Sequence, residues 1–205
     1  MDKLKGIFRI NKKVFVFLLC VVILGILFGS ILPIFLSSDD KRLVSEYLFS
    51  LVLNIKGEFD SLFFLKNGLL CEGLFFLIIW LLGVSIIGVP IILFLFFYKC
   101  FVIGFSISSI IINYGFKGIL FSFIYIFPHY VISIFSYIIL TSYSLIFSIK
   151  LLFFILKKID FNIRLSFRKY LYVFLFGFFI VFICIVYEAF VNPYVLRFIL
   201  NLLGI

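Results

Sequence analysis

The sequence predicts an all-α fold: a polytopic membrane helix bundle with about five transmembrane helices. Of its 205 residues 66% are hydrophobic, and the mean hydropathy is +1.38. Soluble domains are only about 45–50% apolar, so lipid must face much of this surface. The apolar residues also form long runs, and the run over residues 74–97 carries no charge. It exceeds the roughly 20 residues that cross a bilayer, which favours a membrane bundle.

The basic residues flank these apolar runs. The formal net charge is +9, from 18 basic and 9 acidic residues. Orientation in the membrane explains this pattern, so no nucleic-acid partner is expected. Residues 1–13 hold five basic residues and residues 150–169 hold six, which predicts a cytoplasmic N-terminal arm and a cytoplasmic loop. Five spans then place the C-terminus outside, and Lys99 is counted as the twelfth cytoplasmic basic residue.

The first span is expected over 14–36. Gly25 and Gly29 form a GxxxG pair in it, which either lets a neighbouring helix approach closely or is a chance pairing. Residues 37–68 are expected to be an extracytoplasmic loop that contains an amphipathic interfacial helix, because cap residues and acids at 37–40 precede apolar residues at helical spacing. This helix either meets a partner or only caps the bundle. Its apolar positions are Leu43, Tyr47, Leu48, Leu51 and Ile55.

The second span is expected over 69–98, as one helix with breakers in its middle. Gly83, Gly88 and Pro90 all lie inside this uncharged run. Pro90 removes a backbone donor and clashes one turn back, so we expect a kink near residues 86–88. Lipid cannot satisfy the carbonyl groups that a kink frees, which places this helix in the interior of the bundle.

The third span is expected over 100–114, where Gly104 begins another pair of small residues at four-residue spacing. Residues 118–149 are too long for one straight span and are broken at Pro128. They form either one kinked fourth span or a short re-entrant piece over 119–127 followed by a span. The remaining segments are the basic loop over 150–169, a fifth span over 170–190 and an extracytoplasmic tail over 191–205.

Few side chains in these runs could carry chemistry. Glu72, His129 and Glu188 are candidates because ionisable groups are costly inside a membrane. Glu188, one turn before Asn192, either accepts hydrogen bonds from backbone at a helix break or serves in partner binding or proton handling. His129 either donates a hydrogen bond to a backbone carbonyl that Pro128 leaves open or serves a functional role. The four cysteines and single histidine fit no metal motif and no catalytic motif is present, so neither a cofactor nor an enzymatic activity is expected.

Five short motifs follow one another along the chain. They are WLLGVSIIGVP at 80–90, Lys99 with Gly104-Phe105 after it, FKG at 116–118, FPH at 127–129 and YEAFVNP at 187–193. In order and spacing they resemble the stage II sporulation protein M family. The resemblance covers nearly the whole chain, and the basic N-terminal arm and five predicted spans agree with it.

The resemblance implies a non-catalytic membrane scaffold in sporulation. Such a scaffold recruits two peptidoglycan-degrading partners, the stage II sporulation proteins P and D, for engulfment of the forespore. It implies a multi-pass protein of the cell membrane, at the sporulation septum on the mother-cell side. The alternative is a small transporter or channel component, which needs a water-lined path past Glu188, His129 or Glu72.

Overall fold

The computed structural model describes residues 12–57, 60–85, 87–156 and 162–203. All regular structure in these ranges is helical. Five segments are long and apolar enough to cross a membrane, which confirms the predicted all-α fold with five candidate spans. These candidate segments are Lys12–Phe35, Ser61–Gly83, Gly88–Ile124, His129–Ile155 and Ile163–Phe190, and the third and fourth are parts of one element that reverses at Gly115.

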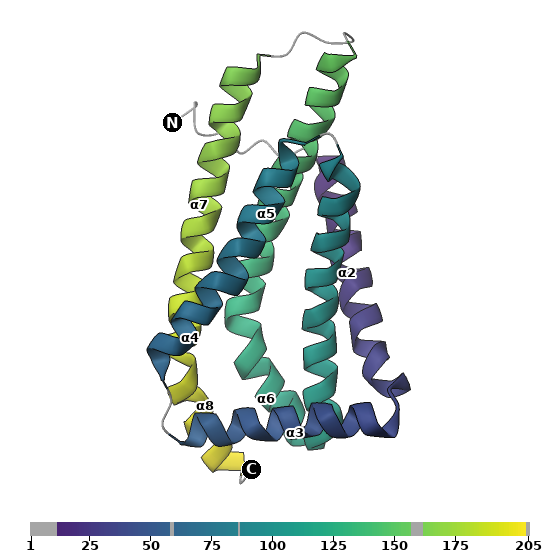
Figure 1. The fold of residues 1–205 in the computed structure, drawn as a ribbon. Helices are drawn as coiled ribbons and strands as arrows, with labels where there is room; N and C mark the ends of the chain where they lie inside the picture. The colour runs from purple at the N-terminus through teal and green to yellow at the C-terminus, as the bar shows by residue number, and fades with distance from the viewer. Residues whose placement is uncertain (1–11, 58–59, 86, 157–161, 204–205) are drawn as a thin grey trace.

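The spans stand side by side, and one helix crosses the end of the bundle (Figure 1). α2 (Lys12–Phe35) runs from the upper end of Figure 1 to the lower end, where α3 (Ser38–Lys56) lies across the bundle. The chain returns upward through α4 (Ser61–Gly68), η1 (Leu69–Gly73) and α5 (Leu74–Gly83). α6 (Gly88–Ile155) then runs downward as a first limb, residues 88–114, and upward again as a second limb, residues 116–155. α7 (Ile163–Phe190) descends to α8 (Asn192–Leu203). We call the end that holds α3 and α8 the platform end and the opposite end the basic end.

α2 packs against the first limb of α6 through small residues. A Cβ atom on Gly25 would lie 2.7 Å from the Cβ of Cys100, and one on Gly29 would lie 2.8 Å from the carbonyl carbon of Phe101. A Cβ on Gly104 would in turn lie 2.9 Å from backbone atoms of Ile26. The two backbones therefore touch, as small residues at four-residue spacing allow in membrane helices.

The segment expected as one kinked span over 69–98 is instead two spans joined by a tight reversal. α5 ends at Gly83 and α6 begins at Gly88, so the expectation of a single helix is wrong. A Cβ on Gly88 would lie 2.7 Å from the carbonyl carbon of Leu82, so only glycine lets the chain fold back this closely. An uncharged run conceals such a turn, because hydropathy records apolar length and not direction.

The carbonyl of Ser85, in the reversal, finds its partners inside the protein. The Ser85 carbonyl accepts hydrogen bonds from the Gly88 N–H (3.2 Å) and from the hydroxyl of Ser148 on the second limb of α6 (2.6 Å). Pro90 is the third residue of α6, where a backbone N–H has no partner within the helix. Pro90 therefore helps to start a helix, whereas we expected it to kink one.

The span boundaries shift accordingly. The second span begins at Ser61, inside the expected 37–68 loop, and the expected third span over 100–114 is only the second half of a limb that begins at Gly88. The fifth span begins at Ile163, inside the expected 150–169 loop. The expected tail over 191–205 contains α8 at the platform end.

α6 turns back on itself at Gly115, where φ is 58° and ψ is −135°. A positive φ favours glycine because other residues bring Cβ against the backbone. The second limb is helical through Ile155, so residues 119–127 belong to a long helix, not to a re-entrant piece. Pro128 lies within this limb, and its side chain is outside the described residues.

α3 forms the surface of the platform end. Ser37 caps it, since the Ser37 hydroxyl accepts from the Asp40 N–H at 3.2 Å, and acids occupy its first turn as the sequence indicates.

The face of α3 toward the bundle is formed by Leu48 and Val52, which pack with Leu196 of α8. Of the expected apolar positions, Leu48 faces the bundle, whereas Leu43 and Tyr47 are 64% and 65% exposed. Leu51 and Ile55 have side chains outside the described residues. The Arg197 guanidinium donates to the Gly57 carbonyl and ties α8 to the end of α3.

Candidate functional site

An ion pair lies deep within the spans. The Lys99 ammonium donates to the Glu72 carboxylate, and the two side chains are 15% and 19% exposed. Lys99 lies about 16 Å along α6 from Gly88, at about 1.5 Å per residue. The charge pattern of the sequence predicts Lys99 among the cytoplasmic basic residues. The structure brings both Lys99 and Glu72 to the interior, where each neutralises a charge that would otherwise be costly.

Glu72 belongs to a π-helical turn. η1 (Leu69–Gly73) interrupts the span between α4 and α5, and such insertions alter the regular backbone hydrogen bonds of a helix. The Tyr137 hydroxyl lies 3.1 Å from the Glu72 carbonyl and 2.9 Å from its carboxylate oxygen Oε2. A tyrosine hydroxyl has one proton, so it donates to one of these oxygens at a time. Tyr137 is thus a partner of Glu72 that sequence reasoning missed.

Aromatic rings surround the Lys99 ammonium. Its Nζ lies 5.7 Å from the ring centre of Phe75, 5.9 Å from that of Tyr130 and 5.6 Å from that of Tyr137. Cations are attracted to ring faces at such distances, more strongly where water is excluded. The rings therefore add to the ion pair in holding a charge among apolar neighbours.

A second pair joins α6 to α7. His129 Nε2 lies 3.4 Å from the Glu188 carboxylate oxygen Oε2, and Glu188 is also within electrostatic reach of Glu72 and Lys99. We call Glu72, Lys99, His129, Tyr137 and Glu188 the intramembrane cluster. The structure thus brings together the three ionisable candidates that the sequence singled out.

Two further features adjoin the second pair. Asn192 is buried at the first residue of α8, directly beyond the span that carries Glu188. His129 also lines an apolar groove of about 270 Å³ between α6 and α7. The other residues that line this groove are Ile132, Ile180, Ile183, Cys184 and Tyr187.

Hydrogen bonds between spans continue toward the basic end. The Tyr170 hydroxyl on α7 donates to the Trp80 carbonyl at 2.7 Å and lies 2.7 Å from the Ser144 hydroxyl. A Cβ on Gly83 would lie 2.8 Å from the Ser144 Cβ, so glycine makes room for this contact. The Ser136 hydroxyl likewise donates to the Gly177 carbonyl at 3.0 Å. These bonds fasten α5 and α7 to the second limb of α6.

The ion pairs of the intramembrane cluster join helices to one another. In the part of the chain that the structure describes, each ionisable side chain of the intramembrane cluster faces a group of opposite charge or a hydrogen-bonding partner. Lys99 was the member that the sequence misplaced. The signal that could have found it is the Gly88-Val89-Pro90 triplet, which suits a helix start and would have put Lys99 in mid-span.

Three comparisons bear on identity. No curated protein and no solved structure matches the chain. A family model does match, described as stage II sporulation protein M, over residues 14–193. That family is not a known enzyme family. The match spans all five membrane segments and the intramembrane cluster, and the chain belongs to the stage II sporulation protein M family.

Proposed function

We propose that this protein is a non-catalytic membrane scaffold in sporulation. In this role it recruits peptidoglycan-degrading partners, the stage II sporulation proteins P and D, to the septum for engulfment of the forespore. The family match supports a sporulation-related membrane protein. The observation that carries the scaffold role is the pairing of Glu72 with Lys99 and of His129 with Glu188. Such pairing fixes helix positions, which a scaffold requires.

The distribution of basic residues supports an orientation. The segments 1–13 and 150–169 hold 11 of the 18 basic residues. The helices α2 and α7 both begin at the basic end of the bundle (Figure 1). Cytoplasmic loops are enriched in Lys and Arg, so the basic end faces the cytoplasm. The platform end then faces the cell wall, on the mother-cell side of the septum in this proposal. Peptidoglycan-degrading partners act on that side.

The exposed face of α3 is the proposed contact with a partner. Leu43, Tyr47 and Phe49 are each at least 60% exposed on it, beside an ion pair between Arg42 and Glu46 at 3.0 Å. Because Leu48 and Val52 already hold α3 to the bundle, the outward residues are available without unfolding the helix. Apolar and charged residues together are typical of surfaces that bind proteins.

Affinity purification from detergent extracts of sporulating cells tests the proposal. The full chain should recover the peptidoglycan hydrolase, and Leu43→Ala with Tyr47→Ala should lower that recovery several-fold. The matched control is Ile23→Ala with Phe28→Ala, two similarly exposed apolar residues on α2. Clean recovery of the protein without any hydrolase would contradict the scaffold role. Equal recovery by both double variants would contradict the assignment of α3.

A transporter or channel component is the second candidate, and the intramembrane cluster is the observation in its favour. Ionisable groups within spans often mark ion pathways. Glu188→Gln and His129→Ala would interrupt such a path. If both variants support engulfment and assemble at parental levels, the transport function loses the residues on which it depends.

A further inference from the structure

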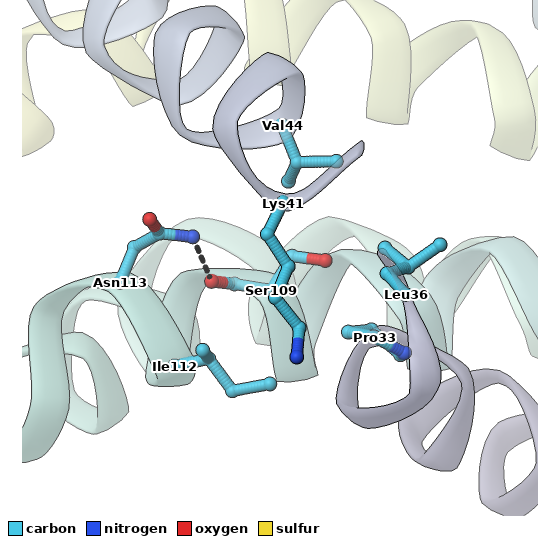
Figure 2. A pocket seen from close by; sticks show the side chains of 7 residues that line it. All are labelled: Pro33, Leu36, Lys41, Val44, Ser109, Ile112 and Asn113. Atoms are coloured by element: carbon cyan, nitrogen blue, oxygen red, sulfur yellow. Dashed lines mark hydrogen bonds between the residues drawn. The ribbon is translucent and has the colours of Figure 1, made fainter. Parts of the chain in front are cut away.

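A small pocket lies at the platform end, where three helices meet (Figure 2). It has a volume of about 50 Å³ and lies between the last turn of α2, the first turns of α3 and the first limb of α6. Of the residues that line it, Pro33 and Ser109 are buried, while Lys41 and Asn113 are exposed. Its other lining residues are Leu36, Val44 and Ile112.

Lys41 supplies a fixed positive charge. Its Nζ donates to the Ile34 carbonyl at 3.0 Å, in the last turn of α2. An ammonium group has three N–H donors, so two can still reach a ligand. The neighbouring Asp40 carboxylate accepts from the Ser37 hydroxyl at 2.6 Å and does not line the pocket.

Ser109 supplies a buried hydroxyl. Ser109 is 3% exposed, and its Oγ has no hydrogen-bond partner among the described residues. Ser106, one turn earlier on the same helix, donates to the Val102 carbonyl at 2.9 Å. The Asn113 amide donates to the backbone carbonyl of Ser109 at 2.8 Å, as Figure 2 shows, and leaves the hydroxyl itself unengaged by Asn113. A buried polar group without a partner is destabilising, so a bound group that accepts its proton would relieve the cost.

We infer that this pocket binds the phosphate group of a phospholipid. Lys41 and Ser109 both line this small space, and an ammonium and a hydroxyl suit a phosphate, which accepts charge-assisted hydrogen bonds. One water needs about 10–15 Å³ of such space, so the pocket admits a group of several heavy atoms.

The position in the membrane supports a lipid over a free ion. α2 ends at Phe35, and α3 crosses the end of the bundle directly beyond it (Figure 1). Pro33, Leu36 and Lys41 line the pocket at this junction, at the end of a helix of bilayer length, so the pocket is expected at the level of the lipid headgroups. Ile34, Phe35 and Ile112 are exposed apolar side chains next to the pocket, where acyl chains would lie.

Native mass spectrometry of the purified full chain in detergent tests the assignment. Phosphatidylglycerol should bind, whereas diacylglycerol, which lacks the phosphate, should bind much more weakly. Ser109→Ala should weaken phosphatidylglycerol binding about tenfold, since one hydrogen bond to a charged group is lost. Ser106→Ala is the matched control and should bind like the parent. Without added lipid, Ser109→Ala should unfold at or above the parental temperature, because the Ser109 hydroxyl holds no other group.

A second pair tests the charge. Lys41→Gln should weaken phosphatidylglycerol binding more than Ser109→Ala, and Arg42→Gln, on the neighbouring residue, should leave it unchanged. Equal binding of diacylglycerol and phosphatidylglycerol, or equal binding by Ser109→Ala and Ser106→Ala, would overturn the proposal. Displacement of the lipid by millimolar inorganic phosphate would overturn the lipid assignment in favour of a free anion.

Discussion

The two limbs of α6 are held by different means. The first limb packs on α2 through Gly25, Gly29 and Gly104, where backbones touch. The second limb is tied to η1, to the 83–88 turn and to α7 by side-chain hydrogen bonds, and the Glu72–Lys99 ion pair joins η1 to the first limb. Lipid is as apolar as the helices, so burial of apolar surface drives association weakly in a membrane. The comparison shows the two remaining means, close van der Waals contact and polar bonding, used side by side in one chain.

The largest expected effect is at the ion pair. Lys99→Met should lower the free energy of unfolding by about 3–5 kcal/mol, because Glu72 is left charged within the spans without its cationic partner. Thermal unfolding of the purified protein in detergent measures this. Adding Glu72→Gln to Lys99→Met should restore most of the loss. A single variant as stable as the parent would show that polar bonding contributes little to the bundle.

In the contact between α2 and the first limb of α6, Gly29→Ala should lower the free energy of unfolding by about 1–3 kcal/mol. The Cβ of alanine would meet the backbone of Phe101, which cannot rotate away. The same unfolding measurement applies. Gly73→Ala is the control, because its Cβ would find Phe178 at an ordinary 3.6 Å. Equal losses of unfolding free energy for the two variants would mean that α2 and the first limb of α6 are not in close contact at Gly29.

A substitution at Gly115, where the two limbs of α6 join, should lower the free energy of unfolding by less. Gly115→Ala should cost about 1–2 kcal/mol, because alanine is strained at a φ of 58° although its Cβ would meet no atom within 4 Å. Phe116→Ala, at the next and highly exposed residue, should change stability by about 0.5 kcal/mol or less. A neutral Gly115→Ala would show that the hairpin is free to adopt another turn.

The smallest expected effect is at one hydrogen bond of the second limb. Tyr170→Phe should cost about 0.5–1.5 kcal/mol, since the Trp80 carbonyl and the Ser144 hydroxyl lose a partner. Tyr172→Phe, on the exposed side of the same helix, should leave the unfolding temperature unchanged. If both substitutions are silent, the polar bonds of the second limb are individually dispensable.

Composition and local pattern alone predicted the membrane bundle, the number of spans and the capped helix that begins at Ser38. These features follow from apolar length and from short-range hydrogen bonds, which a sequence displays directly. The same reasoning flagged Glu72, His129 and Glu188 as unusual, but not which groups they face.

Only the tertiary structure decided where the 69–98 run turns and which charges pair. The turn is tolerated because the Ser85 carbonyl meets Ser148, 63 residues further along the chain. Lys99 is tolerated in mid-span because Glu72, 27 residues earlier, lies beside it. Both depend on partners far apart in the sequence, and in lipid a polar group is placed by its partner more than by its neighbours in the chain.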